Sequence, residues 1–186
     1  DGEAWALLVY TQLLLDNDSI QRAKELLEDS LLVNWPRQAD WVRAYRNLNL
    51  GLVLTYEGDY TKAKAQFEKA SLLFEVSEAP ELHLLLVQSL AENSRYRGRF
   101  DESLSKWYEA LQLAEFLADS FAIADIQMGM GVVRYLLEER DLANENVNLA
   151  YDFYIRKGAK KKIAYGLSLK GLLAYQRGYF QKSIEK

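Results

Sequence analysis

The residues that could carry out chemistry are few and scattered along the chain. The sequence contains no cysteine and a single histidine, His83. Without cysteine there is no disulfide, no thiolate zinc site and no cysteine nucleophile, and one histidine excludes sites built from several. His83 lies between two leucines near the start of an expected helix, and we interpret it as a structural residue. These residues predict no catalytic site, no metal site and no cofactor, and therefore a protein that is not an enzyme.

Two further clusters were candidates for binding an ion or an acidic partner. Asp141, Asn144 and Glu145 offer too few oxygen ligands for a calcium loop and lack its glycine. The one dense charge run is basic and consists of Arg156, Lys157, Lys160, Lys161 and Lys162. Its first two residues suit the end of a helix, where the macrodipole favours cations, whereas the last three would begin the next helix, where it disfavours them. Two interpretations remain open, a solvated loop and a contact for an acidic partner.

Composition sets the class of protein that must position these residues. The chain has 186 residues, of which 49% are hydrophobic and 27% charged, as in a folded domain. The net charge of −4 argues against direct nucleic-acid binding, and no apolar run approaches the roughly 18–20 residues that span a bilayer. The chain begins at Asp1 without a signal-like segment, so we expect a fragment of a longer protein. The lack of cysteine favours a cytoplasmic location.

The dominant feature is an internal repeat of 40 residues. Five segments align without a gap on small anchor residues, which are Ala23, Ala63, Ser103, Ala143 and Ser183. Twelve positions before the anchors lie Thr11, Gly51, Ala91, Gly131 and Gly171. Four positions after the first four anchors lie Leu27, Phe67, Trp107 and Val147. So many matches in one register indicate a repeat protein, in which the small residues let facing helices approach closely.

Each repeat unit predicts two antiparallel helices joined at a turn. We expect first helices over residues 3–15, 37–57, 80–97, 120–138 and 160–177. The second helices are expected over residues 19–33, 59–76, 100–118, 141–157 and from 179 onward. Gly58, Gly98 and Gly178 supply the left-handed residue that ends a first helix, and Glu138 breaks this pattern. The predicted N-caps of second helices are Asp18, Asp59 and Asp141. The sequence thus predicts one all-α domain over residues 1–186, with about four and a half repeats.

The repeats resemble the tetratricopeptide repeat (TPR) family. The resemblance rests on LGL at 50–52, GDY at 58–60, KAKAQFEKA at 62–70 and GRF followed by SLSKWYEA within 98–110. The period of 40 exceeds the usual 34, which makes the chain similar to the lengthened repeats of maltose-activator-type bacterial regulators and of the kinesin light chain. The family implies a right-handed superhelical solenoid whose first helices line a concave groove for a partner peptide or helix.

The repeat register places candidate groove residues 18, 15, 11 and 8 positions before each anchor. The partner-binding candidates are Trp5, Tyr45, Leu48, Leu52, Gln88, Glu92, Arg95, Met128, Val132, Tyr135, Tyr165, Leu172 and Tyr175. Chaperone-binding members of the family carry a lysine of a two-carboxylate clamp at a position held here by Leu8, Leu48, Gln88, Met128 and Ser168, so we expect no such clamp. The apolar candidates either form a slot for an amphipathic helix or extended segment, or pack against neighbouring units.

The predicted function is a non-enzymatic protein-protein interaction module that holds a partner segment in its groove. The alternative is an effector- or inhibitor-sensing solenoid arm of a bacterial transcriptional activator, involved in transcription regulation. That alternative requires an NTPase domain before this chain and a helix-turn-helix after it. Neither hypothesis involves direct nucleic-acid binding by this segment or membrane insertion.

Overall fold

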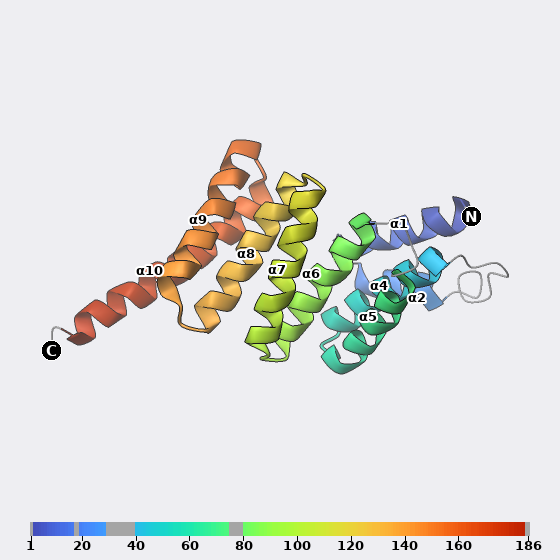
Figure 1. Cartoon of the computed structure of the whole chain (residues 1–186), viewed down its shortest axis with the longest axis horizontal. Helices are drawn as coiled ribbons and strands as arrows, with labels where there is room; N and C mark the ends of the chain where they lie inside the picture. The colour runs from blue at the N-terminus through green and yellow to red at the C-terminus, as the bar shows by residue number, and fades with distance from the viewer. Residues whose placement is uncertain (1, 17–18, 29–39, 75–79, 185–186) are drawn as a thin grey trace. The chain divides into compact units, whose positions relative to one another are not determined.

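The computed structural model describes residues 2–16, 19–28, 40–74 and 80–184, and all regular secondary structure in these ranges is α-helical (Figure 1). The all-α helical-repeat class predicted from the sequence is confirmed. Within each of the two units described next, helices that follow one another in the sequence pack against each other. The chain divides into two compact units, Asp1–Arg97 and Gly98–Lys186.

Most of the helices have 15 to 18 residues, whereas α2 has 9 and α10 has 25. The first unit contains α1 (Gly2–Asp16), α2 (Ile20–Glu28), α4 (Asp40–Tyr56), α5 (Tyr60–Phe74) and α6 (Pro80–Tyr96). The second contains α7 (Phe100–Phe116), α8 (Ser120–Leu136), α9 (Arg140–Lys157) and α10 (Lys160–Ile184). Pro80, Phe100, Ser120 and Lys160 begin helices as predicted. Proline suits this place because the first amide of a helix has no intrahelical acceptor.

Small residues twelve positions before the anchors let paired helices touch. A Cβ atom added to Gly51 of α4 would lie 2.3 Å from Cε1 of Phe67 on α5. A Cβ atom on Gly131 of α8 would lie 2.6 Å from Cγ2 of Val147 on α9. Any side chain at either position would overlap its neighbour, so the predicted close approach of the two helices is confirmed in both pairs.

Left-handed residues connect the helices. Gly58 and Gly98 have φ angles of +82° and +71°, which confirms their predicted role at the ends of first helices. Glu138, which breaks the glycine pattern in the sequence, nevertheless adopts φ +63°. Ala118 and Gly158 are left-handed as well. In the second unit a left-handed residue therefore follows the end of α7, of α8 and of α9. The backbone path is therefore kept even where the glycine is not.

Removing the side chain of Glu138 and adding one at Gly158 should change the free energy of unfolding in opposite directions. A residue with a Cβ atom is strained by about 1–2 kcal/mol in the left-handed region, and glycine is not. Glu138→Gly should therefore raise the free energy of unfolding by up to about 1 kcal/mol after the extra chain entropy of glycine is subtracted. Gly158→Ala should lower it by about 1 kcal/mol. Urea unfolding followed by circular dichroism tests both, and a destabilised Glu138→Gly variant would contradict the argument.

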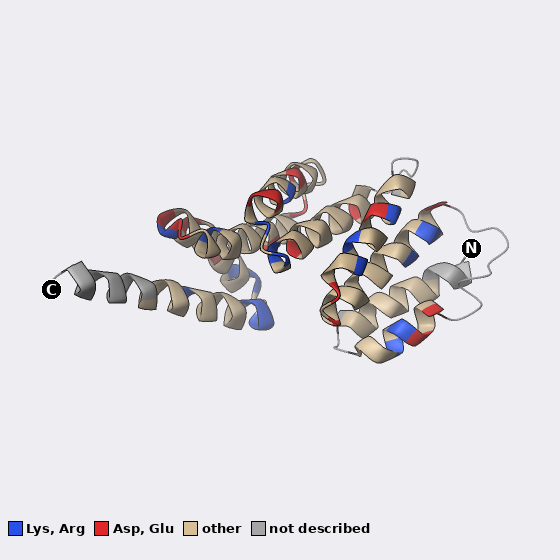
Figure 2. Cartoon of the chain, turned by 90° about the horizontal axis from the view of Figure 1, so that it is seen from below, with Lys and Arg blue, Asp and Glu red and all other residues tan. Residues whose placement is uncertain are grey.

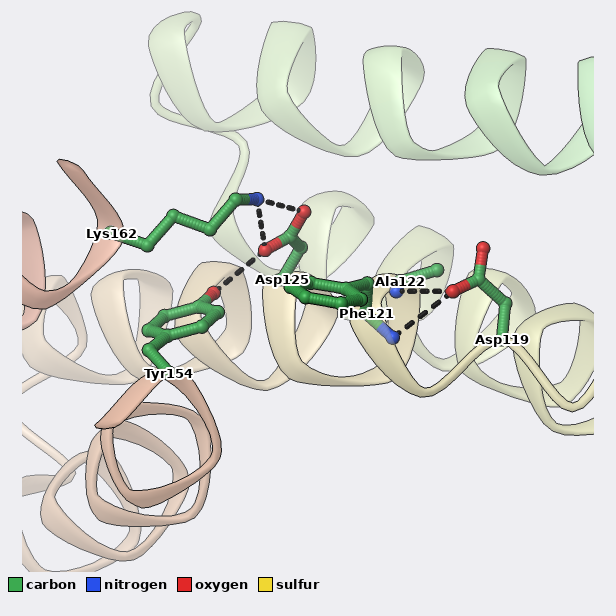
Figure 3. Close-up of polar contacts among 6 residues, drawn as sticks. All are labelled: Asp119, Phe121, Ala122, Asp125, Tyr154 and Lys162. Carbon is green, nitrogen blue, oxygen red and sulfur yellow. Dashed lines mark hydrogen bonds and ion pairs between the residues drawn. The ribbon is translucent and has the colours of Figure 1, made fainter. Parts of the chain in front are cut away.

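The predicted caps of the second helices are only partly correct. A side-chain oxygen of Asp59 accepts a hydrogen bond from the backbone N–H of Lys62 at 3.1 Å, as an N-cap should. Asp18 lies outside the described residues. The prediction for Asp141 is wrong, because α9 begins one residue earlier and Asp141 lies in its first turn. A cap that the sequence analysis missed is Asp119, which accepts from the backbone N–H groups of Phe121 and Ala122 at 3.0 Å each (Figure 3).

The turn predicted at Gly178 is not formed. Helix α10 continues through Gly178 to Ile184, so the prediction of a separate helix from residue 179 is wrong. Extending a helix adds one hydrogen bond for each residue fixed, whereas a reversal needs packing to compensate for the lost bonds. At Gly171, where a second helix would pack, no described atom lies within 4 Å of an added Cβ.

Candidate functional site

In the first unit, two predicted groove residues belong to the hydrophobic core. Tyr45 and Leu48 on α4 are 5% and 0% exposed, and Leu52 is half-buried against the same cluster. For Tyr45 and Leu48 the interpretation as packing residues therefore describes the structure better than the interpretation as contacts for a partner. Trp5 lies on α1, and its side chain is outside the described residues.

The polar candidates on α6 form a contact among themselves. The guanidinium of Arg95 donates two hydrogen bonds to Oε2 of Glu92, at 2.9 Å and 2.6 Å, and lies 4.0 Å from the ring centroid of Tyr96. Burial tends to lower the pKa of Arg95, but Glu92 and, to a smaller extent, Tyr96 raise it, and the net shift of the pKa is upward. Tyr96 in turn stacks on Tyr60 of α5, with ring centroids 5.0 Å apart. Arg95 is thus held charged against α6, while Gln88 is half-buried on the same helix.

The candidates on α8 also contribute to a core. Met128 is 4% exposed and belongs to a cluster formed by α8, α9 and α10. Val132 and Tyr135 are half-buried against that cluster. A partner segment could therefore touch the outer edges of Val132 and Tyr135 but not Met128.

The candidates on α10 are different, because their side chains face solvent. Tyr165, Leu172 and Tyr175 are 55%, 48% and 72% exposed. Their spacing of seven and three residues places them along one side of the helix. Leu169 and Leu173, on another side of α10, are buried against α8 and α9. Of the apolar candidates whose side chains are described, these three are the most accessible.

Within the basic run, Lys162 forms an ion pair, whereas Lys160 and Lys161 are exposed. The ammonium group of Lys162 on α10 forms an ion pair with the carboxylate of Asp125 on α8 (Figure 3). The hydroxyl of the buried Tyr154 on α9 donates a hydrogen bond to the same carboxylate at 2.8 Å. Asp125 therefore links α8 to both α9 and α10, and its ion pair with Lys162 competes with the predicted role of that lysine toward an acidic partner.

Lys160 and Lys161 are exposed in the first turn of α10. Figure 2 shows basic residues at the beginning of this helix. Positive charge at a helix N-terminus is unfavourable for the helix itself. These two lysines remain candidates for contact with an acidic partner.

The contact between Tyr154 and Asp125 predicts a dependence of stability on high pH. Burial, and then the negative charge of Asp125, raise the pKa of Tyr154 above the ordinary value of 10.0. Its stabilising effect is therefore complete below pH 10 and is lost as the pH rises, because the unfolded chain releases this proton before the folded chain does. Urea unfolding at about pH 9 and pH 11 should show a smaller loss of stability for Tyr154→Phe than for the unsubstituted chain. Equal losses would contradict the assignment.

The sequence analysis missed a second exposed side of α10. Ala164, Leu167, Gly171 and Ala174 are all exposed. The last three lie three, seven and ten residues after Ala164, and all four therefore lie on one face of the helix. The available signal was the repeat register, since Gly171 holds the position at which α4 and α8 receive a neighbouring helix.

No group of three or more His, Cys, Asp or Glu residues in the ranges that the structure describes is placed to hold a metal ion. Within the same ranges, no helix combines the length and apolar character needed to cross a membrane.

Comparison with known proteins supports the fold. No family model matches the chain, and no curated protein matches it either. Among solved structures, the chain is similar to BtubC (BKLC) from P. vanneervenii, with a TM-score of 0.64 and 17% sequence identity. The match covers 95% of this chain and 68% of that chain. At this identity the likeness concerns the fold alone, and by fold the chain is an all-α helical-repeat protein.

Proposed function

We propose that this chain is a non-enzymatic protein-binding module. It binds an apolar segment of a partner protein on the side of α10 that carries Tyr165, Leu172 and Tyr175. The observation that supports the proposal is the exposure of Tyr165, Leu172 and Tyr175 at predicted groove positions. We further propose that the repeats are of the TPR type, on the sequence motifs at 50–52, 58–60, 62–70 and 98–110.

The residue types on this side of α10 suit a protein partner. Tyrosine is enriched in protein interfaces because its ring offers a large apolar area together with a hydroxyl that bonds at the wet edge. A leucine between two tyrosines supplies an aliphatic anchor of the kind that fills a partner's pocket. Burying one such side chain is worth roughly 1.5–3 kcal/mol, which corresponds to about tenfold or more in affinity.

The experiment begins by selecting binding peptides from a random displayed library against the whole chain. Selected peptides are then titrated by fluorescence anisotropy at low and high salt. The double variant Leu172→Ala/Tyr175→Ala should weaken binding at least about tenfold, because two exposed anchors are removed. Lys161→Ala should change the affinity little, and salt should weaken binding only modestly, because screening acts on charges and not on apolar contacts.

Leu149→Ala on α9 is the matched control, because Leu149 is 55% exposed and lies on a different helix. It should bind the selected peptides with unchanged affinity. Selected peptides that bind the double variant normally and are released by Lys161→Ala or by salt would contradict the proposed surface. In that case binding would occur at the basic turn before α10.

A further inference from the structure

A pocket in the first unit gathers positively charged side chains. Its volume is about 310 Å³, and residues of the packed helices α4 and α5 line it. Each helix contributes residues spaced i, i+3 and i+4, which lie on one face of a helix. They are Arg43, Arg46 and Asn47 from α4 and Lys69, Leu72 and Leu73 from α5. The described lining therefore has three cations and no acidic side chain, in a chain whose net charge is −4.

The pocket also has an apolar wall, formed by two leucines of α5. Leu73 is half-buried and packs against the hydrophobic core of the first unit. Leu72 is 70% exposed, so much of its apolar surface is in contact with water. A ligand that covers Leu72 removes this surface from water, which favours binding. The lining thus suits a ligand that has both an anionic and an apolar part.

Arg46 is the cation that the structure holds in place. Its Nε donates a hydrogen bond to the backbone carbonyl of Leu27 on α2 at 3.0 Å, and its side chain is half-buried. Burial lowers the pKa of Arg46, and the negative charge of Glu28 offsets this effect only in part. The protein therefore stabilises this charge less well than water does, and an anion in the pocket would supply the missing compensation.

The charges around the pocket indicate how much negative charge the ligand carries. Arg43 forms an ion pair with Asp40, one turn earlier on α4. Arg46 interacts with the charge of Glu28. Two of the three cations thus have a carboxylate nearby, and about one positive charge remains to be neutralised. A carboxylate carries one negative charge, and its two oxygens match the paired N–H groups of a guanidinium.

We propose that this pocket binds the carboxylate group of a small ligand whose other end is aliphatic. The carboxylate lies against Arg46 and Lys69, and the aliphatic end lies against Leu72 and Leu73. The volume is at the small end of the range of about 300–1,000 Å³ for ligand sites, which suits a small molecule. The same chemistry is found in a free carboxylic acid and in the C-terminal leucine of another chain. The pocket involves no residue of α10, so the inference is independent of the proposed protein-binding function.

The test compares two probes that differ only in charge. The whole chain is titrated with isocaproate and with isocaproamide, which has the same aliphatic body and no charge. The backbone amide signals of Asn47 and Leu73 report binding in NMR correlation spectra. We expect saturable shifts with isocaproate and at least about tenfold weaker binding of the amide, because the amide makes no charge-assisted hydrogen bond. Inorganic phosphate, which has no aliphatic part and carries more charge, should bind more weakly than isocaproate.

Substitutions at two exposed positions of the lining test which residues form the site. Lys69→Glu should weaken isocaproate binding at least about tenfold, because it replaces an attractive charge with a repulsive one. Leu72→Ala should weaken it several-fold by removing apolar contact. Lys62→Glu is the matched control, since Lys62 is also exposed on α5 and does not line the pocket. It should bind isocaproate as the unsubstituted chain does, and circular dichroism should show equal helix content in all three variants.

Several outcomes would overturn the inference. They are the absence of a saturable shift, equal binding of isocaproate and its amide, and equal effects of Lys69→Glu and Lys62→Glu. Tighter binding of phosphate than of isocaproate would overturn the assigned carboxylate. A tripeptide of two glycines and a C-terminal leucine, acetylated at its N-terminus, distinguishes the two sources. If it binds as isocaproate does, the pocket takes the end of another chain, and if it does not bind, the ligand is a free acid.

Discussion

Replacing Gly51 with alanine is expected to lower the free energy of unfolding of the first unit by about 1–3 kcal/mol. The added Cβ atom would lie 2.3 Å, 2.6 Å and 2.9 Å from three ring atoms of Phe67. Phe67 lies on α5 and is fully buried in the core that α5 forms with α4, so its ring has little room to move. Relief requires the two helices to separate, which loosens the core around Leu48 and Ala63. Urea unfolding by circular dichroism measures the loss.

A double-mutant cycle tests whether the Phe67 ring is the cause. Phe67→Leu alone should cost stability by opening a small cavity. Combined with Gly51→Ala it should cost less than the sum of the two single changes, because the smaller side chain leaves room for the new methyl group. Additive costs would show that the contact between Gly51 and Phe67 does not limit the approach of the helices.

Gly171→Ala is the matched control for this cycle, since Gly171 occupies the same repeat position and meets no described atom within 4 Å. Alanine is favoured over glycine within a helix by about 0.8–1 kcal/mol, so this change should raise stability. The same substitution in the same register should thus have opposite signs on α4 and α10. Equal signs would mean that helix propensity, and not the neighbouring helix, governs both sites.

The helix pairs could be predicted from the sequence because their causes are local and periodic. Gly51 and Gly131 each lie sixteen residues before the large side chain that contacts them, and the 40-residue register repeats this relation. The turns were predicted less completely. Glu138 adopts a left-handed conformation that its residue type disfavours, because the packed helices α8 and α9 determine the path of the chain between them.

The candidate binding residues could be predicted only in part, because residue type and register do not specify what lies next to a helix. Val132 and Leu172 share a register position and a similar side chain, yet Val132 is half-buried and Leu172 is 48% exposed. Leu48 and Met128 also share a position, and both belong to hydrophobic cores. A periodic pattern places these residues on a face, but the neighbouring helices decide whether a partner can reach them.

Deleting residues 141–186 is expected to abolish protection from hydrogen exchange in α8 while leaving α4 and α5 protected. The buried cluster of α8, α9 and α10 consists of Ala124, Met128, Ala143, Val147, Ala150, Tyr154, Leu169 and Leu173. The deletion removes six of these eight residues and leaves Ala124 and Met128 without their partners. The deletion leaves α8 packed against α7 alone, through Trp107 beside Gly129, and a helix of 17 residues is marginal in water without more packing than that, so α8 depends on the lost contacts for its protection.

The first unit should survive this deletion because its core is built within it. Its buried cluster runs from Leu8 to Leu86 and includes no residue of the deleted segment. In repeat proteins, stability is approximately the sum of each repeat and its contacts with its neighbours, so removal of distant repeats leaves the others folded. Hydrogen exchange measured by mass spectrometry should therefore give unchanged protection for peptides around Leu48 and Phe67. Loss of protection throughout the chain would show instead that its two units unfold as one, and that the first unit needs more than its own core to stay folded.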